Sequence, residues 1–144
     1  MSKLEEQIAE HEGFRSYAYQ DSLGYWTIGY GRLIDKSKGG GITVAEGRYL
    51  LRNDIGSHAI ALVNHFPWVV GLDEVRRNVL IDMAFNLGIP GLSLFRNTLA
   101  AVKRGDWQAA ASGMRNSKWA EQVGNRAERL ARAMETGTMP KKWW

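Results

Sequence analysis

The sequence predicts an α+β fold in which one helix comes first, a small antiparallel sheet second and a helical bundle last. At the N-terminus, and again from residue 43 almost to the end, apolar residues recur at helical spacing. Between these segments, aromatic residues crowd into positions 14–30 and are interrupted by glycines, which is typical of short strands joined by turns. Because so small a sheet is not stable alone, we expect it to pack against the helices, with a cleft between the two lobes.

The length and composition fit one domain with two lobes. The chain has 144 residues, of which 44% are apolar, so that it can bury a core. We expect a single domain over residues 1–144, with a β lobe over about 13–43 and a helical lobe formed by residues 1–12 and 44–144. No stretch approaches the roughly 18 apolar residues of a membrane span. The N-terminus turns acidic at once, so we expect no signal peptide and no membrane anchor.

Several kinds of chemistry are excluded by residue type. The chain has no cysteine, which rules out a disulfide scaffold, a thiolate zinc site and a cysteine nucleophile. Its three histidines do not form a zinc-ligand pattern. We therefore expect no metal and no cofactor.

Positive charge is concentrated near the C-terminus. Residues 1–95 contain 9 Lys/Arg and 11 Asp/Glu, whereas residues 96–144 contain 10 Lys/Arg and 4 Asp/Glu. A basic surface of this kind suits an anionic membrane or an acidic wall polymer, although a solvated basic face is the simpler interpretation. No nucleic-acid-binding motif is present, so no nucleic-acid partner is expected.

Capping signals set the helix boundaries. Ser2 can cap a helix over residues 2–12, and Gly13 fits its C-terminal end. The pattern Thr43-x-x-Glu46 is a capping box for a helix that runs toward Val63 before Pro67. Asp73 can cap the next helix, which residues 88–91 should end. Further helices are expected over 93–104, 107–115 and 118–135. We interpret Arg76-Arg77 as a solvated face and residues 141–144 as a frayed tail.

Three residues near the N-terminus could carry acid–base chemistry. Glu12 closes the first helix, where the carbonyl end of the helix dipole disfavours a charged carboxylate, as suits a proton donor. Asp21 lies in the turn sequence Asp-Ser-x-Gly, and Thr27 lies in a strand-like run. Taken singly, each has an ordinary structural explanation. Together, two carboxyl groups in different environments beside a hydroxyl are what glycosidic cleavage requires, provided that a hairpin brings them to one cleft.

The combined motif resembles a known enzyme family. Glu12-x8-Asp21-x5-Thr27, with Thr-Ile-Gly-x-Gly, is similar to the bacteriophage lysozymes of the T-even type, glycoside hydrolase family 24. The resemblance extends along nearly the whole chain, which implies a lysozyme-like fold. Matching segments include Leu72–Arg77, Phe85-x-x-Gly88, Trp107-x-x-Ala110-Ala111, Lys118-Trp119, Asn125-Arg126-Ala127 and Thr136-Gly137-Thr138.

The resemblance implies roles for particular residues. Glu12 would be the general acid, while Asp21 and Thr27 would hold or activate the attacking water. Arg32 stands where this family frequently has a histidine. The residues implied as substrate contacts are Leu33, Phe85, Thr98 and Arg126. The implied reaction is hydrolysis, usually with inversion, of the β-1,4 bond between N-acetylmuramic acid and N-acetylglucosamine.

The resemblance also implies a biological setting. The protein would be an endolysin, a monomer acting on bacterial peptidoglycan to lyse the host cell. It would remain in the host cytoplasm until a membrane lesion, typically made by a holin, released it to the wall. An alternative is a non-catalytic cationic protein on the same scaffold, which binds the wall or disrupts anionic membranes through its basic C-terminal half and terminal tryptophans.

Overall fold

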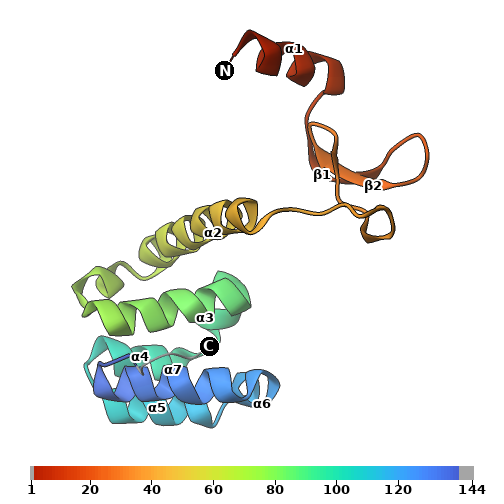
Figure 1. The fold of residues 1–144 in the computed structure, drawn as a ribbon. Coiled ribbons are helices and arrows are strands. Elements are labelled where there is room, and N and C mark those ends of the chain that lie inside the picture. Colours follow the sequence, from red (N-terminus) through yellow and green to blue (C-terminus); the bar gives the residue numbers. More distant parts are fainter. Residues whose placement is uncertain (1, 140–144) are drawn as a thin grey trace. The chain divides into compact units, whose positions relative to one another are not determined.

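The computed structural model describes residues 2–139, and the chain divides into two compact units, residues 1–50 and 51–144 (Figure 1). The first, here called the small unit, contains a helix and a three-stranded antiparallel sheet. The second, the helical unit, contains the remaining α-helices, except that the first turns of α2 (Val44–His65) fall within the small unit. This arrangement confirms the expected α+β fold. The assignment of residues 1–12 to the helical lobe stays a prediction.

Helix α1 (Lys3–Glu12) begins and ends as its caps predict. Ser2 Oγ accepts a hydrogen bond from Glu5 N, and the Glu5 carboxylate accepts one from Ser2 N, which is the reciprocal pattern of a capping box. At the other end, Gly13 has a φ of 71° and donates its N–H to Ala9 O. The helix therefore terminates directly after Glu12, which fixes the position of that residue in the chain.

The sheet has the order β1 (Arg15–Gln20), β2 (Trp26–Gly29) and β3 (Arg32–Leu33). Tyr19 pairs with Thr27, and Thr27 pairs with Leu33, so one row of side chains crosses all three strands. Directly paired residues lie on the same face of an antiparallel sheet. Thr27 is thus the central member of a row that also holds Tyr19 and Leu33.

A short loop secures the start of the central strand. The loop contains a 3-10 turn, η1 (Lys36–Lys38), capped by Asp35, whose Oδ1 accepts hydrogen bonds from the backbone and hydroxyl of Ser37. Asp35 Oδ2 accepts from Trp26 N, while Ile34 N and Asp35 N both donate to Trp26 O. These contacts hold Trp26, and with it the neighbouring Thr27, in register with β3.

Helix α2 (Val44–His65) begins at the predicted capping box. Thr43 Oγ1 accepts from Glu46 N, and Glu46 Oε1 accepts from Thr43 N. The same Glu46 carboxylate forms an ion pair with Arg32 at 2.6 Å. One side chain therefore both caps α2 and ties its first turn to β3.

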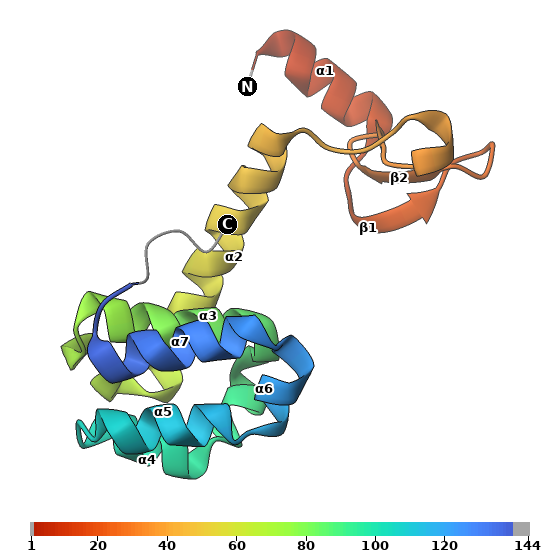
Figure 2. The same ribbon diagram turned by 60° about the horizontal axis from the view of Figure 1, so that its bottom comes forward.

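The helical unit is a bundle around one apolar core. Its elements after α2 are η2 (Pro67–Gly71), α3 (Glu74–Ser93), α4 (Arg96–Lys103), α5 (Trp107–Arg115), α6 (Lys118–Val123) and α7 (Asn125–Thr136). Helices α5 and α7 lie side by side, as Figures 1 and 2 both show. The fully buried large side chains include Leu62, Leu80, Met83, Leu92, Met114, Leu130 and Met134.

Glycines interrupt two of the expected helices. In α3, Gly88 has φ 71° and ψ 166°, which breaks the helix at the predicted place, but a further helical turn continues to Ser93. The segment expected as one helix over 118–135 is two helices, because Gly124 between α6 and α7 has φ 61° and ψ −126°. The prediction of one uninterrupted helix there was wrong.

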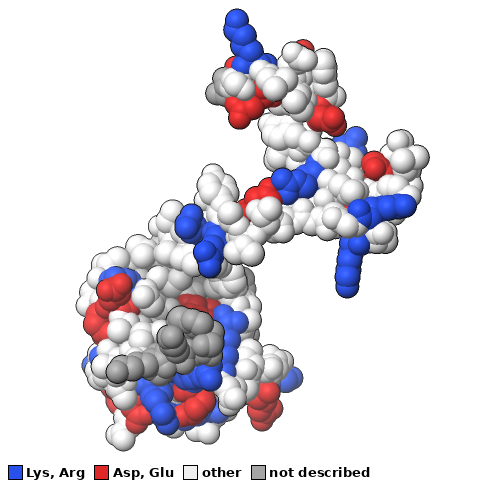
Figure 3. All heavy atoms as spheres, viewed as in Figure 1, with Lys and Arg blue, Asp and Glu red and all other residues white. Residues whose placement is uncertain are grey.

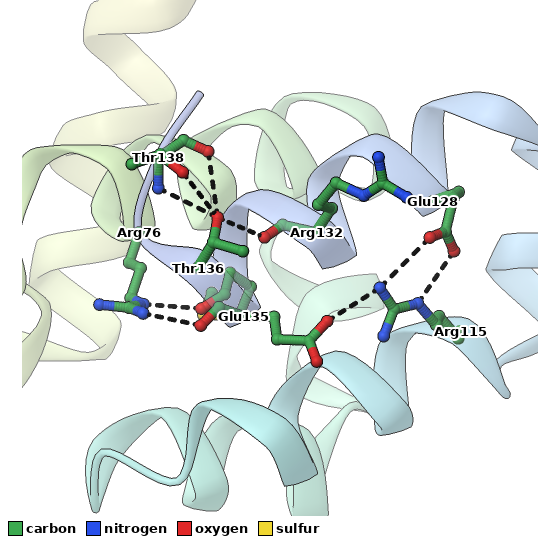
Figure 4. Close-up of polar contacts among 8 residues, drawn as sticks. Arg76, Arg115, Glu128, Arg132, Glu135, Thr136 and Thr138 are labelled. Atoms are coloured by element: carbon green, nitrogen blue, oxygen red, sulfur yellow. Dashed lines mark hydrogen bonds and ion pairs between the residues drawn. The ribbon is translucent and has the colours of Figure 1, made fainter. Parts of the chain in front are cut away.

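Arg76 is not part of a solvated face. Its guanidinium donates to the carbonyl oxygens of Met134 at 2.6 Å and Glu135 at 3.0 Å (Figure 4), and it stacks over the Trp107 ring at 4.0 Å. A cation at these carbonyls satisfies the end of α7 and interacts favourably with its dipole. Nearby, Arg115 bridges Glu128 and Glu135, which joins α5 to α7 (Figure 4).

Within residues 2–139, no single helix has both the length and the hydropathy to cross a membrane. The bent pair α3 and α4 meets those limits only when the two helices are taken together. The predicted frayed tail, residues 141–144, lies outside the described residues.

Candidate active site

The structure places all three predicted catalytic residues in the small unit. Glu12 is the last residue of α1 and is exposed. Its carboxyl group lies against the turn that joins β2 to β3, where a Cβ built on Gly31 would be only 2.7 Å from Glu12 Oε2. Within the described residues of the small unit, no hydrogen bond or ion pair engages this carboxyl group. Within this unit, the carboxyl group is therefore open to a ligand.

Asp21 uses one carboxylate oxygen to build the turn between β1 and β2. Its Oδ1 accepts hydrogen bonds from the N–H groups of Leu23 and Tyr25, each at 2.9 Å. The backbone of Asp21 adds bonds to Tyr25 O and from Gly24 N. No described residue of the small unit donates to Oδ2. The turn thus fixes the carboxylate and leaves one oxygen available to accept a proton from water.

Thr27 is buried, with 5% of its surface exposed, and its hydroxyl donates to Tyr25 O at 3.0 Å. Because the hydroxyl proton is used in this bond, a ligand or water at Thr27 would meet an acceptor. The Tyr25 backbone thereby joins the two residues: its N–H binds Asp21 and its carbonyl binds Thr27. Leu33 lies directly across from Thr27 on β3 and shares its face of the sheet.

The two predicted carboxyl groups belong to opposite ends of β2. Asp21 lies in the turn before this strand, and Glu12 lies against the turn after it. Four extended residues span about 10 Å between the first and last Cα atoms. Two carboxyl groups so arranged, with an acceptor hydroxyl between them, can protonate one atom and hold a water at another.

Phe85 and Arg126 lie together in the helical unit. Both line a groove of about 390 Å³ whose other walls are Leu51, Ile55, Asn78, Ile81 and Asp82. Arg126 donates both Nε and Nη2 to Asp82 Oδ1, and Phe85 remains 37% exposed. The structure therefore brings these two predicted substrate contacts to one groove, which has a largely apolar wall and contains the Arg126–Asp82 ion pair.

Thr98 lines a different groove of the helical unit, of about 660 Å³. It is buried, and a Cβ on Gly113 would collide with its hydroxyl oxygen, so α4 and α5 approach closely there because Gly113 lacks a side chain. The buried Trp119, at the same groove, donates its indole N–H to Asn86 at 2.8 Å. Thr98 is thus placed apart from Phe85 and Arg126 within this unit.

Arg32 forms an ion pair with a carboxylate group. It binds Glu46, and it also donates to Gly41 O at 3.3 Å. The hydrogen bonds from Arg32 and Thr43 lower the pKa of Glu46 to about 2. Hydrogen bonds from Ser37 and Trp26 likewise lower the pKa of Asp35. Both carboxylates are charged and structural at neutral pH. Among the described residues, no three His, Asp or Glu side chains cluster in a way that could hold a metal ion.

A comparison with protein families identifies the family of the chain. The model of the phage lysozyme family matches residues 9–135, which include all the site residues described above. The chain belongs to the phage lysozyme family. It is accordingly a lysozyme-type hydrolase that acts on peptidoglycan, and the resemblance inferred from the sequence motifs is confirmed.

Individual relatives agree with the family. The chain is 28% identical to "Probable T4-type lysozyme 1" of Dictyostelium discoideum, over 96% of this chain and 97% of that protein. It is 30% identical to "Endolysin" of Acyrthosiphon pisum secondary endosymbiont phage 1, over 79% of this chain and 75% of that one. It is 29% identical to "Pre-baseplate central spike protein Gp5" of Enterobacteria phage T4, where the match covers 94% of this chain but only 28% of the relative.

Several residues of this lysozyme's candidate site were not found from the sequence. The close approach of Gly31 to Glu12 has no local signature, since the two residues are far apart in the chain. Asp82 could have been found: Asn78, Asp82 and Phe85 recur at helical spacing, which places three residues of the groove on one face of α3. Tyr25 acts through its backbone, which no sequence pattern reveals.

Proposed function

We propose that this lysozyme is a muramidase, which cleaves the β-1,4 bond between N-acetylmuramic acid and N-acetylglucosamine, and that Glu12 is its general acid. The observation that carries the proposal is the position of two differently held carboxyl groups at opposite ends of β2. Glu12 has no internal hydrogen bond in the described small unit, whereas Asp21 is held by two backbone N–H groups. A proton donor and a second carboxylate fixed in place are the two groups that glycosidic cleavage needs.

In the proposed reaction, the Glu12 carboxyl group protonates the glycosidic oxygen as the bond to the anomeric carbon breaks. Asp21 Oδ2 accepts one proton of the attacking water, and Thr27 Oγ1 accepts a hydrogen bond from the other. With both of its protons directed to these acceptors, the water presents a lone pair to the sugar. The bond from Thr27 to Tyr25 O supports this orientation, because it leaves the hydroxyl oxygen as an acceptor.

We propose inversion of configuration at the anomeric carbon. An inverting enzyme needs roughly 6.5–9.5 Å between its two carboxyl groups so that water fits between one of them and the sugar. The length of β2 between the Asp21 turn and the Gly31 turn favours this separation over the shorter one of retaining enzymes. Leu33, Phe85, Thr98 and Arg126 are proposed substrate contacts, Phe85 and Arg126 through their shared groove.

The decisive experiment compares Glu12→Gln with Glu10→Gln on purified peptidoglycan. Both variants lie on α1 and remove one exposed carboxylate. Loss of a general acid is expected to lower the rate by about 10²–10⁴-fold, while Glu10→Gln keeps the wild-type rate. The products should carry new N-acetylmuramic acid reducing ends. Full activity of folded Glu12→Gln would refute the assignment, and N-acetylglucosamine ends would refute muramidase specificity.

We further propose that the protein is a monomeric endolysin, which stays in the host cytoplasm until a holin-type membrane lesion releases it to the wall. Inducing the protein in host cells with and without a membrane-permeabilising agent tests this. Lysis only with the agent supports the proposal. If induction alone causes lysis that Glu12→Gln retains, the non-catalytic membrane-active alternative replaces it.

A further inference from the structure

A side chain at Gly31, in the turn between β2 and β3, would collide with the carboxyl group of Glu12. A Cβ on this residue would lie 2.7 Å from Glu12 Oε2 and 3.2 Å from the Glu12 carboxyl carbon. Ordinary van der Waals contact at such a Cβ begins at 3.4 Å. The carboxyl group of Glu12 therefore occupies the place that a methyl group would take.

The close approach matters because little else in the described small unit restrains this carboxyl group. Glu12 is exposed, and in the described small unit its side chain is held by no hydrogen bond or ion pair. Its neighbour Gly13 has already left the helix. The surface of the turn at Gly31 is thus what defines how near the carboxyl group comes to β2, the strand that carries Thr27.

We propose that Gly31 is a positioning residue of the active site, which sets the location of the Glu12 carboxyl group by presenting bare backbone to it. The inference rests on the proposed function, in that Glu12 is taken as the general acid. A methyl group at position 31 pushes the carboxyl group away, since the end of a glutamate side chain moves more easily than a hairpin backbone. Displacement of a catalytic group by about 1 Å can lower a rate about 10²-fold.

Gly29 offers a matched control in the same hairpin. Both glycines have a positive φ, 76° at Gly31 and 68° at Gly29, so an alanine at either position strains the backbone in a similar way. A Cβ on Gly29, however, would meet no atom within 4 Å. Any effect of Gly31→Ala beyond that of Gly29→Ala is therefore due to the contact with Glu12.

The test combines carbon NMR of carboxyl-labelled glutamate with kinetics on a soluble glycan fragment. Gly31→Ala is expected to move the Glu12 carboxyl resonance, and to lower kcat about 10²-fold with little change in KM. Gly29→Ala should leave the Glu12 resonance near its wild-type position. If the Glu12 carboxyl resonance has the same position in Gly31→Ala and Gly29→Ala, the inference is overturned. If Gly31→Ala moves the Glu12 resonance but Glu12→Gln is fully active, Gly31 still positions Glu12 and the proposed function is what fails.

A second variant covers the case in which Gly31→Ala does not fold. In the double variant Glu12→Ala/Gly31→Ala the new methyl group no longer meets a carboxyl group. This double variant should then be as thermally stable as Glu12→Ala/Gly29→Ala. If it stays unfolded while the Gly29 double variant folds, the contact with Glu12 is not what excludes a side chain at position 31, and the inference is overturned.

Discussion

The two oxygens of the Asp21 carboxylate have separate roles, so different substitutions of Asp21 should affect stability and activity to different extents. Oδ1 holds the N–H groups of Leu23 and Tyr25, and Oδ2 is open to water. Asp21→Asn keeps an acceptor for the turn but lacks the negative charge that withdraws a proton from water. We expect it to retain the thermal stability of the wild type and to lose about 10²–10⁴-fold in rate.

Asp21→Ala is the companion variant. It removes the turn acceptor as well as the charge, so it should lose activity together with about 1–3 kcal/mol of stability from the two lost hydrogen bonds. Thermal unfolding and turnover are measured on both variants. Equal stability losses in Asp21→Asn and Asp21→Ala would show that Oδ1 does not hold the turn, and an active Asp21→Asn would contradict the role proposed for Oδ2.

At the scale of elements, the start of α2 should respond to acid. Hydrogen bonds from Arg32 and Thr43 lower the pKa of Glu46 to about 2, from the ordinary value of 4.5. A carboxyl group with a lowered pKa in the folded state stabilises that state fully above its unfolded pKa. The stabilisation is lost as the pH falls from about 4.5 toward 2. The group is exposed, so added salt should weaken the effect.

The measurement is the melting temperature of the wild type and Glu46→Gln from pH 6 to pH 2 at low salt. Glutamine can still accept the Thr43 N–H but cannot pair electrostatically with Arg32. The variant should melt lower than the wild type at pH 6, and the difference should shrink steadily below pH 4.5. A difference that does not change with pH would mean that the ion pair between β3 and α2 contributes nothing to stability.

The elements that could be predicted from the sequence are those with local signals. The Ser2 cap and the Thr43 capping box lie within three residues of their partners, and both were confirmed. The break at Gly124 was missed because a glycine inside a helix costs only about 1 kcal/mol, so it does not by itself end one. Arg76 was misjudged because the carbonyl groups it binds are 58 and 59 residues away.

For the molecule as a whole, some parts of the candidate site have a local sequence signal, whereas others depend on packing between residues that are far apart in the chain. Glu12, Asp21 and Thr27 fall within 16 consecutive positions, so a motif could identify them. Phe85 and Arg126 share a groove only through the packing of α3 against α7, and the ion pair to Asp82 depends on that packing. Family resemblance could suggest these residues, but their partners required the fold.

The charge of the helical unit should govern how fast this lysozyme reaches the wall. Residues 51–144 contain 13 Lys/Arg and 8 Asp/Glu, whereas residues 1–50 contain 6 and 7. On the face shown in Figure 3, acidic side chains lie among the basic ones of the helical unit, and Arg115 and Arg126 are paired with carboxylates. These ion pairs give the two arginines a structural role. The net charge of the helical unit is still positive and attracts an anionic polymer.

Salt should therefore slow wall hydrolysis without slowing the chemistry. Raising NaCl from about 0.02 M to about 0.5 M shortens the screening length several-fold, and we expect about a tenfold fall in the initial rate on intact walls. A short uncharged glycan fragment should be hydrolysed at the same rate at every salt concentration.

Lys103→Gln should lower the rate of wall hydrolysis at low salt and Glu121→Gln should raise it, because the first removes a positive charge and the second a negative one. Both side chains are exposed and lie away from the small unit's catalytic residues in the sequence. The two variants should converge at high salt. Salt dependence that is equal on walls and on the neutral fragment would instead place the effect within the active site.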